Sequence, residues 1–237
     1  MTTNVMTQQG HHSSTTLISA TQWQQISWVL LDMDGTLLDL CFDDTLWRDA
    51  LPIAYAKHAQ IDLDVAKKKV AELADASYGT LNWYCIDFWS TELGFDIRPT
   101  KQTLAHLIGF RRGALAFLKW LKHQNKHVVL ATNAHPDSIA LKDTRTDLSR
   151  WVDQVMHAHE ANAPKEEPAY WHWLQQKTNF VASQTLFIDD NDHILDAATR
   201  EGIAHCVGVK TPNTTAPAKA SRYPAFDHFQ ELYPPSL

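Results

Sequence analysis

Short apolar runs separated by amphipathic stretches occur along most of the chain, and this alternation predicts an α/β fold. The first run, Trp28-Val29-Leu30-Leu31, is continuous, as expected for a parallel strand buried on both faces. Further strands are predicted at 127–131, 152–156, 185–188 and 204–209. Helices are predicted between them at 114–123, from about 137, at 168–177 and at 194–200. The pattern indicates a Rossmann-like, three-layer parallel sheet with helices on both faces.

The segment 42–106 lacks this alternation and predicts helices without strands. Apolar residues at helical spacing predict one helix over 64–76 and a second over 84–93. A third helix begins at Pro99, because proline is favoured in a first helical turn. Pro52 lies inside a helical stretch, where its missing N–H predicts a kink or break. We therefore expect an all-helical insertion directly after the first strand.

The two ends of the chain look less ordered than the rest. The first 25 residues are polar and rich in Ser, Thr and Gln, and the stretch after Lys210 is rich in Pro, Thr and Ala. A single turn of helix is expected there, near Phe226. The expected divisions are a disordered lead-in at 1–25, a core domain at 26–41 and 108–210, a helical insertion at 42–107 and a tail at 211–237.

Composition narrows the class of protein. The chain has 237 residues, 44% of them hydrophobic, enough for one core domain and a modest insertion. A net charge of −6 and the lack of a basic cluster argue against a nucleic-acid partner. No run approaches the roughly 20 apolar residues that span a bilayer, and no signal-peptide core is present. Three widely spaced cysteines, Cys41, Cys85 and Cys206, are typical of a reduced chain. These features predict a soluble cytoplasmic protein without a membrane partner.

Chemistry-bearing residues stand where predicted strands end or in the loops between predicted elements. They are Asp32 and Asp34 in Asp32-Met33-Asp34-Gly35-Thr36, Thr132 and Asn133, Lys165, and Asp189 with Asp190. In open α/β sheets this carboxyl edge is where ligands bind. Each element alone has a simpler interpretation, as a turn, a helix cap or a solvated loop. A receiver domain also combines clustered acids with Thr and Lys, but the order of the acids here excludes it.

In this order the four elements resemble the motifs of the haloacid dehalogenase (HAD) superfamily, whose members are mostly magnesium-dependent phosphatases. The resemblance covers the chain from about Trp28 to Val209. It implies that Asp32 is a nucleophile that forms an aspartyl-phosphate and that Asp34 is the general acid and base. The dehalogenases lack the second aspartate, so Asp34 points to phosphate rather than halide. Gly35 is expected to let the backbone bend so that Asp34 reaches the leaving group.

The same resemblance assigns the remaining groups. The Thr132 hydroxyl and the Asn133 backbone N–H would hold phosphate oxygens, and Lys165 would add positive charge beside them. Mg²⁺ would be bound by the Asp32 carboxylate, the Asp34 backbone carbonyl and the Asp189 carboxylate. Asp190 would orient either Lys165 or a metal-bound water. Ala163 and Asn191 depart from what many relatives carry nearby, but neither change removes a charged or proton-transferring group.

The helical insertion at 42–107 resembles the C1-type cap of this superfamily, which closes over the active site. It holds a distinctive aromatic stretch at 79–89. Together with 32–40, 132–135 and 165–168 it resembles the GMP/IMP-type purine 5′-nucleotidases within the HAD group. That resemblance implies hydrolysis of a purine nucleoside 5′-monophosphate, a small phosphate ester. The candidate pocket residues are Asn82 and Asp87 for base or ribose contacts and Trp83 or Tyr84 for stacking. For any one of these aromatics, packing within the cap is the simpler interpretation.

Several alternatives stay open at this point. The closest is a HAD phosphatase of another small ester, such as a sugar phosphate or phosphoglycolate, and a β-phosphoglucomutase-like activity is less favoured. A non-catalytic nucleotide-binding sensor would share the fold. Asp43 or Asp44 is expected to cap the first cap helix rather than line the cap hinge. His157 and His159 alternate on a strand, but without an evident third ligand they are assigned no metal.

Overall fold

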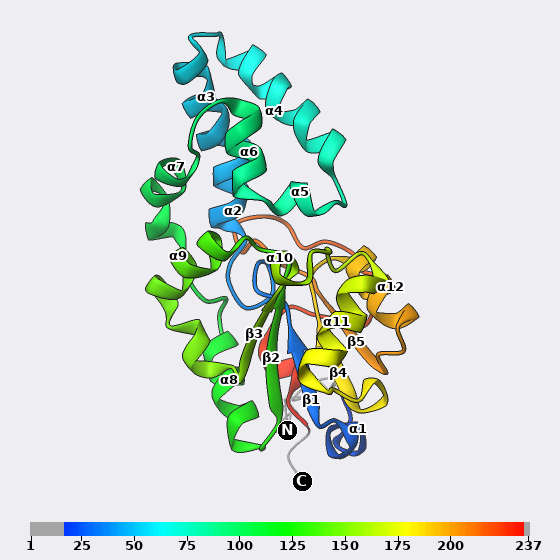
Figure 1. The fold of residues 1–237 in the computed structure, drawn as a ribbon. Helices are drawn as coiled ribbons and strands as arrows, with labels where there is room; N and C mark the ends of the chain where they lie inside the picture. The colour runs from blue at the N-terminus through cyan, green and yellow to red at the C-terminus, as the bar shows by residue number, and fades with distance from the viewer. Residues whose placement is uncertain (1–16, 235–237) are drawn as a thin grey trace, which may run out of the picture.

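A parallel six-stranded sheet forms the centre of the core in the computed structural model, which describes residues 17–234 (Figure 1). The strand order is β3-β2-β1-β4-β5-β6, and all neighbouring pairs are parallel. The strands are β1 (Trp28–Leu31), β2 (His127–Thr132), β3 (Gln154–His157), β4 (Thr185–Ile188), β5 (His205–Val209) and β6 (Ala225–Phe226). The predicted α/β class and parallel sheet are confirmed.

Helices cover both faces of the sheet. They are α1 (Ala20–Gln25), α8 (Ala114–His123), α9 (Pro136–Thr146), α10 (Ala158–Ala161), α11 (Pro168–Thr178) and α12 (Asp192–Arg200), with 3₁₀ turns η3 (Leu148–Trp151), η4 (Ala182–Gln184) and η5 (Phe229–Leu232). Alternate residues of β1 enter different hydrophobic clusters: Val29 and Leu31 pack with α8, and Leu30 packs with α11 and α12. The period-two geometry of a strand thus explains the continuous apolar run, because both faces of β1 are buried.

The segment after β1 folds into helices that stand above the sheet (Figure 1). They are α2 (Cys41–Thr45), the π-helical turn η1 (Leu46–Ala50), α3 (Leu51–Ala59), α4 (Leu63–Ser77), α5 (Leu81–Tyr84), α6 (Ile86–Leu93), α7 (Arg98–Thr103) and the 3₁₀ turn η2 (Ala105–Leu107). A separate hydrophobic cluster, which includes the buried Trp89, packs η1, α3, α4 and α6 together, whereas Phe42 of α2 and the apolar residues of η2 pack with the core cluster. This cluster supports the proposed cap at 42–107.

Two details of the cap differ from the sequence-based expectation. Pro52 does not break the helical backbone, which runs without interruption from α2 through the π-helical turn η1 into α3; of the expected kink or break, only the local distortion of η1 is present. Proline has no backbone N–H to donate, and the π-helical turn accommodates the missing hydrogen bond by changing the local bonding pattern of the helix. The single helix expected over 84–93 is two helices, because Cys85 adopts extended backbone between α5 and α6. Cys85 Sγ accepts a weak hydrogen bond from the N–H of Phe88 and so caps α6.

Both ends of the described chain are more ordered than expected. Residues 17–25 are not a disordered lead-in: α1 begins at a Ser19 capping box, and Trp23 is buried against α8. The rest of the expected lead-in, residues 1–16, lies outside the described residues. The segment around Phe226 is a strand rather than a helical turn, and the 3₁₀ turn η5 follows it. The tail therefore belongs to the core.

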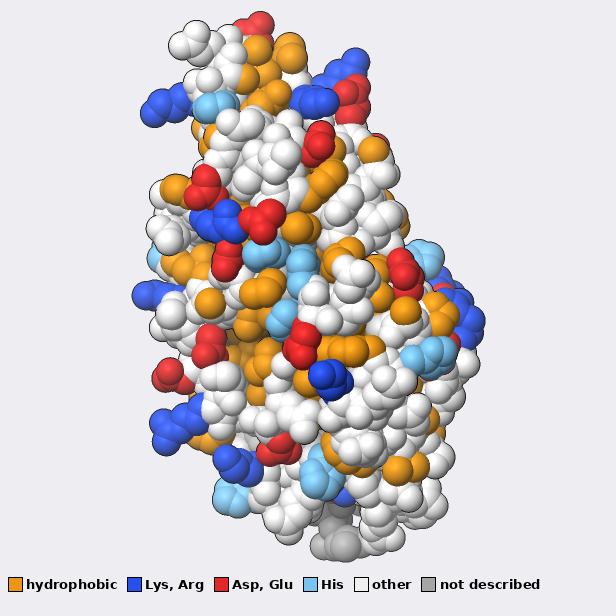
Figure 2. All heavy atoms as spheres, in the orientation of Figure 1, with side chains coloured by type: hydrophobic (Ala, Val, Ile, Leu, Met, Phe, Trp, Pro, Cys, Tyr) orange, Lys and Arg blue, Asp and Glu red, His pale blue; other side chains and the backbone are white. Residues whose placement is uncertain are grey.

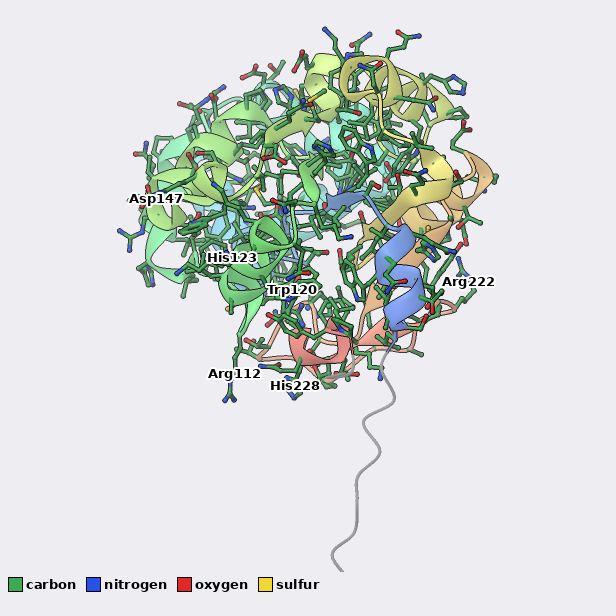
Figure 3. The ribbon with its side chains drawn as sticks, turned by 90° about the horizontal axis from the view of Figure 1, so that it is seen from below. Arg112, Trp120, His123, Asp147, Arg222 and His228 are labelled. Carbon is green, nitrogen blue, oxygen red and sulfur yellow. The ribbon has the colours of Figure 1, made fainter. Side chains whose placement is uncertain are left out.

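Aromatic packing holds this C-terminal segment in place. Phe117 and Trp120 of α8 contact Phe229 and Tyr233, with Phe229 fully buried. Figure 3, seen from the end opposite the cap, shows η5 beside α8, with Trp120 labelled close to it. The guanidinium of Arg111 adds hydrogen bonds to backbone carbonyls of three separate segments, those of Thr36, Thr211 and Asp227. In residues 17–234, no helix is both long and apolar enough to cross a bilayer.

Candidate active site

The register of the sheet brings the first and last acid pairs together. Leu31 of β1 is level with Leu130 of β2 and with Ile188 of β4. The next residues along these strands, Asp32 and Asp189 among them, therefore leave the sheet at one edge. Both aspartates are buried, with 7% and 1% of their surface exposed. Two carboxylates withdrawn from water need a nearby cation to remain charged.

Lys165 supplies that cation. Its Nζ donates to Asp32 Oδ1 at 2.6 Å, to Asp189 Oδ2 at 2.7 Å and to the carbonyl of Ala131 at 3.0 Å. Burial alone would lower the pKa of Lys165, but the charges of Asp189 and Asp32 outweigh it and hold the pKa above its ordinary value. Lys165 is therefore a permanently charged group between the two aspartates, as its sequence position predicts.

Asp34 is turned away from the strand by the glycine that follows it. Gly35 has φ +79°, and a Cβ at this position would lie 2.9 Å from Asp190 Cγ and from Pro212 Cβ. Its N–H donates to the carbonyl of Leu38 at 2.8 Å, which closes the turn. The position thus needs glycine for two reasons, positive φ and close approach. The bend expected from the sequence is present.

A buried lysine that the sequence did not single out contacts Asp34. Lys142 Nζ, on α9, lies 2.6 Å from Asp34 Oδ1 and 2.8 Å from Asp43 Oδ2. Burial and the charge of Asp43 raise the pKa of Asp34 to about 7, and Lys142 opposes this increase. A carboxyl group with a pKa near neutrality can both donate and accept a proton at physiological pH. Asp34 thus has the electrostatic setting of an acid–base group.

The same contact corrects the interpretation of Asp43 and Asp44 as helix caps. The N-cap of α2 is Leu40, which makes no side-chain cap hydrogen bond. Asp43 instead pairs with Lys142, and Asp44 accepts a hydrogen bond from Asn213 Nδ2 at 2.6 Å. Both acids line the cavity below the cap.

The loops that carry Thr132 and Lys165 are connected by side-chain hydrogen bonds. Asn133 Oδ1 accepts from the backbone N–H of Lys165 at 2.8 Å, and its Nδ2 donates to Glu166 Oε2 at 3.0 Å. Tyr84, in the cap, donates its hydroxyl to Glu166 Oε1 at 2.7 Å. Thr132 is buried beside them, with 2% of its surface exposed. This chain of contacts fixes the two loops together and ties the cap to them.

Asp190 does not contact Lys165. Its Oδ2 accepts from Lys219 Nζ at 3.0 Å, so the alternative that remains for Asp190 is contact with a metal-bound water. Carboxylate oxygens of Asp32, Asp189 and Asp190 lie within 4.8 Å of one another. Burial raises the pKa of Asp189 and of Asp190, as expected where carboxylates crowd together. Hard oxygen donors at this spacing fit a small divalent cation such as Mg²⁺.

A cavity of about 300 Å³ opens between this edge of the sheet and the cap. Its floor includes Asp32, Asp34, Thr132, Asn133, Lys165 and Asp189. The cap contributes Trp47, Tyr78, Trp83, Tyr84 and Lys101 to its lining. The volume lies at the lower end of the range typical of small-ligand pockets, about 300–1,000 Å³.

The four candidate pocket residues of the cap divide into two pairs. Trp83 and Tyr84 line the cavity, as the sequence suggests. Asn82 is exposed and is not among the lining residues, and Asp87 points to a different contact, an ion pair with Arg98. Asn82 lies within α5 and Asp87 lies in the first turn of α6, on either side of Cys85, and neither is among the residues that line the cavity.

Sequence reasoning missed two lysines of this cavity. Lys142 stands in an ordinary amphipathic helix, and Lys101 follows Pro99 in a polar stretch, so neither has a motif around it. Lys101 is 3% exposed, its Nζ lies 5.4 Å from the ring centre of Phe42, and burial lowers its pKa to about 8. Burying a lysine without a partner costs free energy. Such a residue is therefore a candidate for ligand binding, but its burial is visible only in the three-dimensional structure.

Comparisons with known proteins agree with this geometry. The family description "Haloacid dehalogenase-like hydrolase" matches residues 29–208. The GMP/IMP nucleotidase YrfG of Escherichia coli is 37% identical over 213 residues, which cover 90% of this chain and 96% of YrfG. The crystal structure of a HAD phosphatase from Thermococcus onnurineus is similar with a TM-score of 0.73 and 18% identity, covering 87% of this chain and 96% of that one.

The fold is also shared by an enzyme whose name indicates a different reaction, dehalogenation. The L-2-haloacid dehalogenase of Xanthobacter autotrophicus superposes with a TM-score of 0.60 and 16% identity, covering 87% of this chain and 96% of that chain. At such identities the similarity concerns the fold, and the site residues must distinguish between the chemistries.

Proposed function

The chain belongs to the haloacid dehalogenase-like hydrolases, and we propose that it is a phosphomonoesterase that hydrolyses purine nucleoside 5′-monophosphates, GMP and IMP, to nucleoside and phosphate. The proposal includes Mg²⁺ as its metal and the cytoplasm as its location. One observation supports the proposal above all: Asp32 contacts Lys165, whereas the nearby Asp34 has a pKa raised to about 7. Two carboxyl groups in different settings suit the separate roles of nucleophile and acid.

In the first step an Asp32 oxygen attacks phosphorus while the bond to the nucleoside 5′-oxygen breaks. Asp34 donates its proton to that departing oxygen, so the nucleoside leaves as a neutral alcohol. In the second step Asp34 accepts a proton from water, which attacks phosphorus and releases Asp32 and inorganic phosphate. Both aspartates return to their starting states. The half-neutralised Asp34 carboxyl is suited to both steps because its pKa lies near 7.

The remaining groups handle the charge of the phosphate. Lys165 keeps a positive charge next to Asp32, and Thr132 and Asn133 stand on the same edge to hold phosphate oxygens. Mg²⁺ would be held by the carboxylates of Asp32 and Asp189 with the backbone carbonyl of Asp34, where it would supply positive charge that offsets the charge of the phosphate.

The purine part of the proposal rests on the similarity to YrfG and on the lining of the cap. Trp47, Trp83 and Tyr84 line the cavity, and aromatic side chains are suited to contact with a heterocyclic base. Lys101 adds a buried donor among them. Guanine and hypoxanthine both carry a ring carbonyl oxygen that accepts a hydrogen bond, whereas adenine carries an amino group at that position. A donor in the pocket would therefore favour GMP and IMP over AMP.

The deciding experiment measures phosphate release from GMP, IMP, AMP, sugar phosphates and phosphoglycolate with Mg²⁺, for the wild-type chain and Asp32→Asn. We expect a preference for GMP and IMP that the variant abolishes. Activity mainly on sugar phosphates or phosphoglycolate would keep the mechanism and overturn the purine assignment. Saturable nucleotide binding without turnover would instead favour the non-catalytic sensor.

A further inference from the structure

A second group of metal-ligand side chains lies apart from the acid site, where the cap meets the core. Cys85 comes from the cap between α5 and α6, His135 is the N-cap residue of α9, and His159 lies in α10. Ligand atoms of the three all lie within 4.8 Å of one another. Histidine side chains gather at this boundary on the face shown in Figure 2. The sequence alone offered His157 and His159 without a third ligand; of these two the fold brings only His159 into the group, together with Cys85 and His135.

The contacts of His159 set it apart from an ordinary surface histidine. Both of its ring nitrogens are buried and have no hydrogen-bond partner among the described residues. Its ring packs edge-on against His135 at 4.8 Å between ring centres. Burial and the neighbouring histidines lower the pKa of His159 to about 4, so the imidazole is neutral and can act as a ligand. A buried polar ring without a partner costs free energy unless something binds it.

We propose that Cys85, His135 and His159 form a transition-metal site that bridges the cap and the core and binds Zn²⁺. One thiolate and two imidazoles are the donors that Zn²⁺ prefers, whereas Mg²⁺ prefers the oxygens of the acid site. Zinc bonds of about 2.0–2.3 Å require the ligand atoms of a tetrahedral site to stand about 3.5 Å apart. Since the ligand atoms lie within 4.8 Å of one another, the cluster needs to contract by at most about 1.3 Å, and a water molecule would complete the four ligands.

Neighbouring acids can orient the ligand ring of His135. Its Nε2 lies 3.6 Å from Asp87 Oδ2, and its Nδ1 lies 3.7 Å from Asp137 Oδ2. Nδ1 accepts a weak hydrogen bond, at 3.2 Å, from the backbone N–H of Asp137. Metal binding through Nε2 requires the ring proton on Nδ1, so Nδ1 must exchange this bond for donation to the Asp137 carboxylate, a common arrangement behind metal-bound histidine. Cys85 loses its thiol proton to solvent on binding.

The position of the site gives it a consequence for activity. Its thiol belongs to the cap and its two imidazoles belong to the core, so a bound metal ties the two together beside Tyr84. A cap that closes over substrate must open again to release product. Bound Zn²⁺ therefore slows turnover at saturating substrate, and this effect rests on the proposed function whereas the binding does not.

The binding test uses Co²⁺ as a spectroscopic probe on chelator-treated protein without substrate. A thiolate bound to Co²⁺ gives a near-ultraviolet charge-transfer band, which carboxylates alone do not give. We expect the band in the wild-type chain, in Cys41→Ser and in Asp189→Asn, and its loss in Cys85→Ser. His159→Gln is expected to weaken the affinity at least tenfold. Absence of the band in the wild-type chain, or its persistence in Cys85→Ser, would overturn the site.

The activity test adds Zn²⁺ to enzyme assayed with excess Mg²⁺. We expect kcat to fall in the wild-type chain and in Cys41→Ser but to be unchanged in Cys85→Ser and His159→Gln. Equal inhibition of all four proteins would place the inhibitory Zn²⁺ at the acid site and overturn the tie between cap and core. If no phosphate ester is hydrolysed, the proposed function fails while the Co²⁺ spectrum still decides the metal site.

Discussion

The ammonium of Lys142 lies 2.6 Å from Oδ1 of Asp34, although 108 positions in the sequence separate the two residues. The same ammonium is 2.8 Å from Asp43, so one buried cation serves two carboxylates. Asp43 and Lys142 therefore have opposite effects on the pKa of Asp34. Burial and Asp43 raise its pKa, and Lys142 lowers it, with the balance near 7. The general acid proposed for the reaction is thereby kept partly protonated at neutral pH.

Replacing Lys142 and replacing Asp43 should shift the pH profile of activity in opposite directions. Lys142→Met removes the charge that lowers the pKa of Asp34, so the basic limb of kcat/KM is expected to move to higher pH. Asp43→Asn removes a charge that raises that pKa, so the same limb should move to lower pH. Lys142→Met should also reduce kcat about 10- to 100-fold, part of the contribution typical of general acid–base catalysis. The measurement is kcat/KM against pH on proteins with native circular dichroism.

Lys142→Arg is the matched control for this series. It keeps the positive charge, so the basic limb of kcat/KM should stay near its wild-type pH. If Lys142→Met and Asp43→Asn shifted the limb in the same direction, the electrostatic account of Asp34 would be wrong. An unchanged profile in both variants would mean that another group is the acid.

The sequence predicts the acid site well because its groups follow buried strands. Asp32 and Asp189 meet at one edge since their strands are parallel neighbours, and Lys165 comes from a loop at that edge. Lys142 and Lys101 could not be found in this way. Each is one lysine in a helix, and only the packing of that helix decides whether its ammonium reaches solvent or a cavity.

Glycine at position 35 should be required for both folding and activity. Gly35→Ala adds a Cβ that would lie 2.9 Å from Asp190 Cγ and Pro212 Cβ at positive φ. The matched control is Gly79→Ala, which has a similar φ of +76° but no atom within 4 Å of its Cβ. The control should lose about 1 kcal/mol of unfolding free energy from backbone conformation alone. Gly35→Ala should lose more and should reduce activity at least tenfold, measured by urea denaturation and phosphate release.

Removal of divalent metal should abolish activity without unfolding the protein. Asp32, Asp189 and Asp190 bring three carboxylates together, which suits a hard cation. Treatment with a chelator is expected to stop phosphate release, and added Mg²⁺ to restore it. Mg²⁺ should also raise the melting temperature of the wild-type chain but not of Asp189→Asn. Full activity of a protein shown to be metal-free would refute the Mg²⁺ assignment.

Lys101 should contribute to substrate binding rather than to folding. Its ammonium is buried in the cavity and has no ion-pair partner among residues 17–234, and burial lowers its pKa to about 8. Lys101→Met should raise KM for GMP about tenfold or more and leave the unfolding free energy unchanged or higher, because a buried charge is removed. Lys67→Met, on the exposed side of α4, is the control and should change neither quantity. A wild-type KM for GMP in Lys101→Met would exclude a contact between Lys101 and the substrate.

The ends of the chain show where composition misleads. The stretch after Lys210 has the Pro- and Thr-rich composition of a tail, yet Phe226, Phe229 and Leu232 are fully buried. Such a short apolar pattern is too weak to predict a strand, and its burial depends on the distant helix α8. α1 was missed for the same reason, since Trp23 is one large apolar residue in a polar segment.

Phe229 should therefore carry much of the stability of the core. Phe229→Ala removes a fully buried ring that packs against Phe117 and Phe226, and large-to-small changes of this kind cost about 3–5 kcal/mol. Ile53→Ala, at a side chain that is 55% exposed, should cost less than about 1 kcal/mol. Urea denaturation followed by circular dichroism measures both. If Phe229→Ala were as mild as Ile53→Ala, the C-terminal segment would not be part of the cooperative core, because the lost ring contacts would have no energetic consequence.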